Sequence, residues 1–150
     1  MQCTAILADS VVCAEGKLYV QGGGWTTIWT NQVPLQWPRV GIGLLITVPW
    51  LDTPQEHTFS LRVENEDGQV LSLGASPPDT AGEVEALDAL GGEFFVGRPR
   101  GLPDGDNQVV PVALNIDGLV LPRFGAYRFV IQLDGADATS MRFRVAAPPG

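Results

Sequence analysis

The sequence has few of the residues on which catalytic and metal centres depend. Its 150 residues include one histidine, His57, and two cysteines, Cys3 and Cys13. A Ser–His–Asp or Cys–His mechanism would have to use His57, yet no Gly-x-Ser-x-Gly motif accompanies it. His57 follows Pro54 at the entrance of an alternating segment, where we expect an exposed histidine without a catalytic role. These absences predict that the protein is not an enzyme and needs no cofactor.

The scarcity of cysteine also bears on the cellular compartment. If residues 3–13 form one strand, at about 3.3 Å per residue, Cys3 and Cys13 lie far beyond the roughly 4.4–6.8 Å that a disulfide spans. We therefore expect free, buried thiols and a reducing, cytoplasmic location. The N-terminus lacks the basic segment of a signal peptide, and no apolar run approaches about 18 residues, so we predict no contact with membranes.

Charged residues are also few, and they are unevenly placed. They make up 17% of the chain, with nine Lys and Arg against 17 Asp and Glu, for a net charge of −8. Residues 1–50 are neutral, residues 51–106 hold twelve acids and three arginines, and residues 107–150 have a small positive excess. A chain of this kind is repelled by polyanions, because nucleic-acid binding depends on Lys and Arg at phosphates. We predict no nucleic-acid partner.

Glycine, proline and alternating apolar residues are abundant. The 18 glycines and 12 prolines divide the chain into short segments, which favours strands over helices. Alternation is clearest over residues 57–64, 108–116 and 127–145. The pattern predicts an all-β fold, a single domain over 1–150, with about eight or nine strands in an antiparallel two-sheet sandwich, immunoglobulin-like or jelly-roll-like. At most one short helix is expected, at residues 83–90.

Turn signals predict how these strands are connected. Glu15-Gly16, Asp67-Gly68, Asp117-Gly118 and Asp134-Gly135 are typical of tight turns, because glycine supplies the positive φ. We therefore expect hairpins that join 4–13 to 17–20, 57–64 to 70–73, and 127–133 to 139–145. Residues 22–24, three glycines in a β context, predict a bulge or a close backbone approach.

Two strands are apolar on both parities. Residues 4–13 and 39–48 carry apolar side chains at odd and even positions alike. We expect these strands to be central, or to be covered on their second face by something else. A second subunit is one such cover.

Several motifs resemble those of a known family. Leu7-Ala8-Asp9, Gly16-Lys17-Leu18-Tyr19 and Gly22-Gly23-Gly24-Trp25 are similar to a family of small bacterial β-sandwich proteins of unknown function, as are residues 95–99, 112–116 and the hairpin after Tyr127. The resemblance implies the fold and a cytoplasmic location, and no activity. Gly125-Ala126-Tyr127 also resembles the start of the penultimate strand in immunoglobulin-like sandwiches, where a tyrosine hydroxyl ties the strand to the preceding corner.

One loop has the composition of a weak calcium site. Asp104, Asp106 and Asn107 offer oxygen ligands in a glycine-rich turn, and calcium prefers such ligands. The same residues also serve turns for backbone reasons alone, and the full calcium-loop spacing is absent. We expect turn chemistry and no bound metal, and we keep calcium as a minor alternative.

Tryptophan is the most informative residue type for binding. Trp25, Trp29, Trp37 and Trp50 all lie within residues 25–50. Trp25 and Trp29 are expected to share one strand face, and Trp37, in a proline-flanked loop, to be exposed. Exposed tryptophans are typical of contacts with partners.

These observations lead to one preferred function and two alternatives. The preferred function is a non-enzymatic β-sandwich that acts through a protein–protein interface, by self-association or by docking on a larger assembly. One alternative is a ligand-binding or carbohydrate-binding module that uses exposed tryptophans such as Trp29 or Trp37. The other is a structural component of a virion or another particle.

Overall fold

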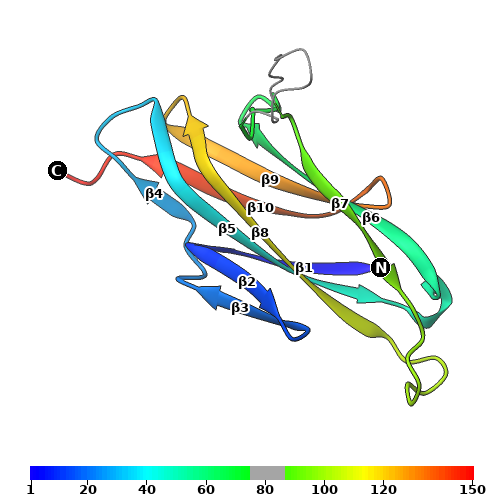
Figure 1. The fold of residues 1–150 in the computed structure, drawn as a ribbon. Coiled ribbons are helices and arrows are strands. Elements are labelled where there is room, and N and C mark those ends of the chain that lie inside the picture. Colours follow the sequence, from blue (N-terminus) through cyan, green and yellow to red (C-terminus); the bar gives the residue numbers. More distant parts are fainter. Residues whose placement is uncertain (75–86) are drawn as a thin grey trace, which may run out of the picture.

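The computed structural model describes residues 1–74 and 87–150 (Figure 1). These residues form ten strands and one 3₁₀ turn, η1 (Trp50–Asp52), and contain no α-helix. The first half of the helix expected at 83–90 lies outside the described residues, and in the second half Leu90 begins a strand. The strands are β1 (Gln2–Ala8), β2 (Ser10–Ala14), β3 (Lys17–Gln21), β4 (Thr27–Trp29), β5 (Leu35–Val48), β6 (Gln55–Asn65), β7 (Leu90–Val96), β8 (Gln108–Leu121), β9 (Gly125–Leu133) and β10 (Ala136–Ala146).

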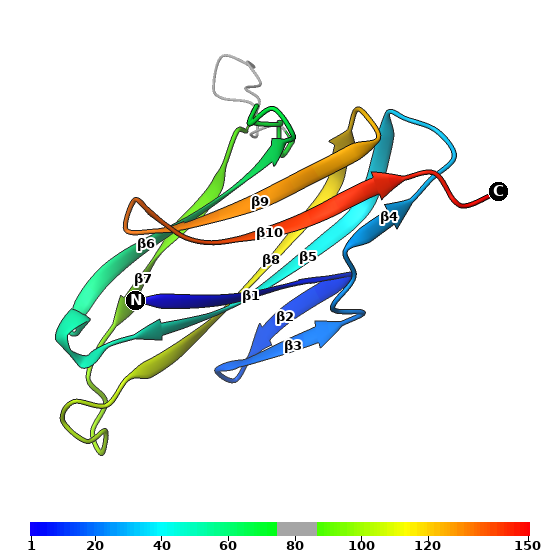
Figure 2. The same cartoon turned by 180° about the vertical axis from the view of Figure 1, so that it is seen from behind.

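The strands form a sandwich of two sheets with a small third sheet beside them (Figures 1 and 2). One sheet has the order β1-β5-β8 and the other β4-β10-β9-β6-β7, while β2 and β3 pair with each other. The prediction of an all-β sandwich is confirmed. The ladders are antiparallel except between β4 and β10, where Thr27 lies opposite Arg144 in a parallel pair.

The core lies between the two large sheets and follows the predicted alternation. β5 contributes Ile42, Leu44 and Ile46, each fully buried. β9 and β10 contribute Phe129 and Phe143, whose rings stack with centroids 5.2 Å apart. Since each aromatic residue of this size buries about 150–250 Å², these two rings are among the largest single contributions to the core.

The strand predicted over residues 4–13 is in fact two strands. The chain breaks at Asp9, whose N–H donates to the carbonyl oxygens of Gln21 and Gly22, and β2 then leaves the sheet that contains β1. The β2–β3 hairpin stacks on the outer face of β5 and β8 instead. The Asn115 side chain of β8 holds it there, because its Oδ1 accepts from Val11 N (3.1 Å) and its Nδ2 donates to Val11 O (2.9 Å). This hairpin is part of the cover that the two-sided apolar pattern required.

Glycine allows the hairpin to come this close. A Cβ at Gly41 of β5 would lie 2.9 Å from the Ser10 Cα, a distance that real Cβ atoms do not reach. The expected close approach within residues 22–24 is also present, because a Cβ at Gly22 would lie 2.2 Å from a carboxylate oxygen of Asp9.

Two of the four predicted turns connect regular hairpins. Glu15-Gly16 joins β2 to β3, and Asp134-Gly135 joins β9 to β10, all four residues with positive φ. The turn expected at Asp117-Gly118 is wrong, because β8 continues through it and pairs with β5 on both sides in one register. The strand expected at 70–73 is reduced to one bridge between Glu64 and Val70, and β6 pairs instead with β7 and β9.

The corner before β9 is held by a tyrosine, as the resemblance at residues 125–127 implied. The buried Tyr127 hydroxyl donates to the carbonyl oxygen of Arg123 (2.7 Å) and accepts from the Arg123 N–H (3.1 Å). One hydroxyl therefore satisfies both backbone groups of a residue in the loop that joins the two sheets.

We predict that Tyr127→Phe lowers the free energy of unfolding by about 1–3 kcal/mol, because both backbone groups of Arg123 lose their partner while the ring still fits the core. Urea denaturation measures the change. Tyr19→Phe is the matched control, since Tyr19 is 50% exposed and should lose less than about 0.5 kcal/mol. Equal effects of the two substitutions would contradict this role for Tyr127.

Candidate functional site

An open apolar groove lies between the β2–β3 hairpin and the outer face of the β1-β5-β8 sheet. Its volume is about 570 Å³. We use "the groove" for the site whose apolar lining residues include Ile6, Leu18, Val20, Leu45, Val109 and Pro111. Val109 is 59% exposed and Leu45 39%, so the groove presents unpartnered apolar side chains to solvent.

Strand register explains why the groove exists. Leu45 of β5 lies between Thr4 of β1 and Pro111 of β8, and Gly43 lies one row nearer the hairpin. A Cβ at Gly43 would lie 2.9 Å from a Leu18 methyl group, so the hairpin covers the Gly43 row closely. The hairpin ends before the next row, which contains Leu45 and Pro111. An apolar surface therefore remains exposed on this part of β5 and β8.

The groove is almost free of charge. Lys17, at the hairpin turn, is the one ionisable residue among those that line it in the described chain. Its remaining lining is aliphatic, glycine or threonine. A face of this composition on an acidic protein favours an apolar partner over a charged one.

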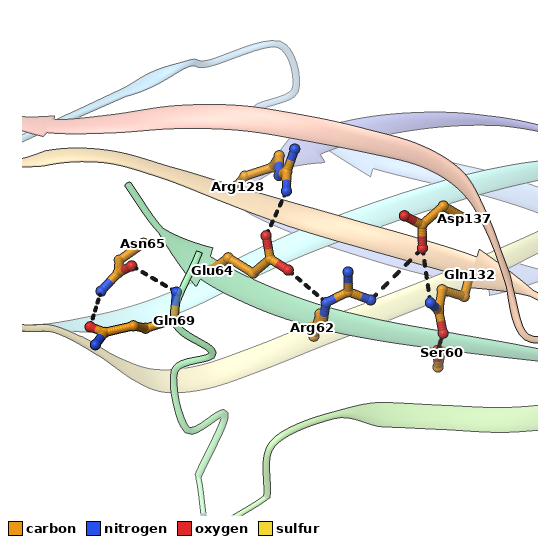
Figure 3. A network of polar contacts seen from close by, with 8 residues as sticks. All are labelled: Ser60, Arg62, Glu64, Asn65, Gln69, Arg128, Gln132 and Asp137. Atoms are coloured by element: carbon orange, nitrogen blue, oxygen red, sulfur yellow. Dashed lines mark hydrogen bonds and ion pairs between the residues drawn. The ribbon is translucent and has the colours of Figure 1, made fainter. Parts of the chain in front are cut away.

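The outer face of the larger sheet is polar by contrast, and an ion-pair network organises it (Figure 3). Glu64 of β6 is 7% exposed and lies between two arginines. Arg62 Nε donates to its Oε1 (2.8 Å), and an Arg128 terminal nitrogen donates to its Oε2 (2.6 Å). These hydrogen bonds, first from Arg128 and then from Arg62, lower the pKa of the Glu64 carboxyl.

A hollow of about 690 Å³ opens beside this network. Its lining includes Glu64, Arg128 and Arg142, together with Tyr127 and Ser140. The sequence reasoning missed this site. The sequence nevertheless contained a signal for it. Arg62 and Glu64 lie at alternate positions of β6, on one face of the strand, and Arg128 and Arg142 lie at the polar alternate positions of the last hairpin.

His57 is buried, which corrects the expectation of an exposed histidine. It is 1% exposed, with Nδ1 2.8 Å from Asp134 Oδ2 and Nε2 2.8 Å from the Asp52 carbonyl oxygen. Both partners are acceptors when Asp134 is ionised, so the imidazolium form, with a proton on each ring nitrogen, satisfies both contacts. Burial opposes the charge, but the hydrogen bonds to Asp134 and Asp52 outweigh it and raise the pKa of His57. This histidine ties two loops together.

Asp134 makes a further hydrogen bond at the end of the sandwich where His57 lies. Its Oδ1 accepts from the Thr58 N–H (2.9 Å). Burial would raise the pKa of Asp134, but the hydrogen bonds from Thr58 and His57 lower it. A second tie at this end involves Arg98, whose guanidinium lies 4.1 Å from the centre of the Trp50 ring and donates to Thr53 Oγ1 (3.0 Å).

The four tryptophans differ in their exposure and contacts. Trp25 packs against the core, edge-on to Phe143 at 6.1 Å, whereas Trp29 is 56% exposed. They do not share a strand face, because β4 begins only at Thr27. Trp37 lies within β5 opposite Leu119 and packs against the core, so its expected exposure in a loop is wrong. Trp29 is the tryptophan that the structure presents to solvent.

The candidate calcium ligands and the cysteines lie apart from these features. Asp104, Asp106 and Asn107 are exposed in the loop between β7 and β8. Within residues 1–74 and 87–150, no three His, Cys, Asp or Glu side chains gather as metal ligands would. Cys3 and Cys13 are unpaired as expected, but Cys3 is only half-buried and Cys13 is exposed.

Comparison with known proteins identifies the family. Residues 3–146 match the family of unknown function DUF6941. The chain belongs to this family. The match confirms the resemblance to a family of unknown function, here with an all-β fold. No curated protein matches the chain.

One solved structure is similar over 97% of this chain. It is a family 123 glycoside hydrolase from Clostridium perfringens, described in connection with glycolipid glycan hydrolysis, with 14% sequence identity and a TM-score of 0.30. The matched region spans 27% of that enzyme. Separately, within the described part of the chain no helix has the length and hydropathy needed to traverse a bilayer.

The His57–Asp134 pair predicts a specific pH dependence of stability. Because the pKa of His57 is raised above its unfolded value of about 6.5, its stabilisation is complete below that value and is lost as pH rises through the folded pKa. We expect the free energy of unfolding, measured in urea from about pH 6 to about pH 9, to fall over this range.

Asp134→Asn provides the control. Asparagine tolerates the positive φ of 49° found at this position, yet it removes the negative charge that favours the imidazolium. The variant should therefore show a flatter dependence than the wild type. The same slope in both proteins would refute the assignment of a charged His57.

Proposed function

We propose that this protein acts through a protein–protein interface, and that the groove is the surface by which it binds a second copy of itself. The supporting observation is the uncovered apolar surface around Leu45 and Val109, which the β2–β3 hairpin leaves open. Contiguous exposed apolar surface of this kind is typical of interaction sites on soluble proteins.

Charge limits where a second copy can bind. Each chain carries a net charge of −8, so two copies repel each other wherever their acidic surfaces meet. The groove contributes only Lys17 as an ionisable lining residue among the described positions, and so repulsion is smallest there. Two apolar sheet faces pack about 10 Å apart, so the exposed apolar side chains of two grooves would bury each other in such a contact.

A two-fold dimer satisfies these constraints with a single type of contact. In such a dimer the same patch is used on both copies, and Val109 of each copy enters the interface of the other. Burial of these side chains stabilises the dimer by about 25 cal/mol per Å² of apolar area removed from water, before the cost of association is subtracted.

We further propose an immunoglobulin-like arrangement and a cytoplasmic location. The Tyr127 hydroxyl bonded to Arg123 supports the first, because the same tie recurs in immunoglobulin-like sandwiches. The unpaired Cys3 and Cys13 support the second. A strand-order comparison with immunoglobulin domains and fractionation of the host cell test these two points.

The exposed ring of Trp29 favours a second candidate function, a ligand-binding module. Trp29 is 56% exposed on the outer face of the larger sheet, where a flat apolar ligand or a sugar ring could stack on it. A saturable shift in tryptophan fluorescence with one member of a glycan panel, lost in Trp29→Phe, would support this candidate. No shift with any glycan would eliminate its carbohydrate form.

We predict that the wild-type protein is a dimer by sedimentation equilibrium and that Val109→Glu weakens the dimer at least about tenfold, because two carboxylates enter an apolar interface. Val120→Glu is the matched control. Val120 is a 48% exposed valine on the same strand and does not line the groove, so its substitution should leave the dissociation constant unchanged.

Circular dichroism and thermal melting should show that both variants remain folded, since both valines are exposed. A wild type that stays monomeric at high concentration would overturn the proposal. Equal weakening by the two substitutions would also overturn it, because the contact would then lie outside the groove.

A further inference from the structure

The outer face of the larger sheet gathers positive charge on an acidic protein. Arg128 of β9 lies directly opposite Arg142 of β10, and Glu64 of β6 lies opposite Arg128 on its other side. Arg144 follows Arg142 by two residues and Arg62 precedes Glu64 by two, so all of them point to the same face. We call Arg62, Arg128, Arg142 and Arg144 the arginine face. It holds four of the nine basic residues of the chain.

The acids near the arginine face are already engaged. Both carboxylate oxygens of Glu64 accept from Arg62 and Arg128. Glu66, at the rim of the hollow, accepts from the Ala126 N–H (2.7 Å). Asp137 lies 3.9 Å from Arg62 and accepts from the Gln132 amide (2.8 Å).

Among the described residues, Arg142 and Arg144 have no such partner. In the described part of the chain, no carboxylate lies within 4 Å of either guanidinium, whereas Arg62 and Arg128 both have one. Like charges directly opposite on neighbouring strands destabilise a sheet, and an arginine cannot relieve this by losing its proton. The bond to Glu64 offsets part of the charge of Arg128, so the repulsion that remains in this pair comes chiefly from Arg142, and a further anion would offset it.

We propose that Arg128 and Arg142 bind an oxyanion, the phosphate or carboxylate group of a small ligand. The geometry supports this, because both side chains line the 690 Å³ hollow and the planar guanidinium is suited to bidentate contact with either group. The Ser140 hydroxyl, which also lines the hollow, supplies a neutral donor. A small anion is favoured over a polyanion, since the net charge of −8 repels long anionic chains.

The experiment compares the melting temperature in inorganic phosphate, in succinate and in sodium chloride at one ionic strength. We expect phosphate or succinate at about twice its dissociation constant to raise the melting temperature of the wild type by about 2 °C beyond the chloride value. A rise in phosphate alone indicates a phosphate ligand, a rise in succinate alone indicates a carboxylate, and a rise in both indicates a site for either. Each of these results supports the proposal.

Arg142→Gln separates binding from a structural role. Without added anion this variant should melt at the wild-type temperature or above it, because the repulsion between Arg128 and Arg142 is removed, yet its response to phosphate or succinate should disappear. Arg100→Gln is the matched control, since Arg100 lies exposed in the loop between β7 and β8. It should respond as the wild type does.

Amide chemical shifts give an independent readout in the same titration. The largest changes should fall on Arg128, Ser140 and Arg142. The proposal is overturned if neither anion exceeds chloride, if Arg142→Gln keeps the full response, or if that variant melts lower while still responding. It does not depend on the groove, and so these results leave the dimer proposal unaffected.

Discussion

The strand β5 is apolar on both faces, and much of the architecture follows from how far each face is covered. β5 pairs with β1 on one edge and with β8 on the other, so its backbone is satisfied and its side chains decide the packing. Ile42 and Leu44 face the core. On the other face Gly41 and Gly43 present no side chain, and the β2–β3 hairpin lies directly on the sheet. The hairpin is shorter than β5, and this difference in length creates the groove.

The outer face of the larger sheet carries polar side chains that pair with one another. Glu64 is nearly buried, which would be costly for a lone carboxylate, but two guanidinium groups hold its oxygens. Its partners come from its own strand and from β9, so the network links β6 to β9 in addition to their backbone ladder. Arg142 lies next to Arg128 on this face, and no carboxylate among the described residues pairs with it. The network therefore explains part of the arginine face as structure, and the remaining positive charge is the part that the proposed oxyanion would offset.

Local pattern predicted the strands well and their pairing less well. Alternation placed the last hairpin correctly, because Asp134-Gly135 supplies both the turn and its register. Asp117-Gly118 has the same local chemistry, yet β8 passes through it, because pairing with β5 on both sides outweighs the turn preference. The break at Asp9 and the burial of His57 depend on partners 12 and 77 residues away, which no local pattern contains. The prediction that Trp37 lies exposed in a loop was wrong for the same reason. The flanking prolines suggested a loop, but β5 begins between them, at Leu35, and includes Trp37.

The two outer faces belong to opposite sheets, and this has a consequence for any assembly. A dimer formed through the groove would join two copies by their β1-β5-β8 sheets and so leave both arginine faces on its outside. Two oxyanion sites on one particle would engage a ligand bearing two such groups with an effective concentration set by the span between the sites. Self-association and ligand binding are thus compatible on this fold, and the first would strengthen the second without changing a single contact in either site.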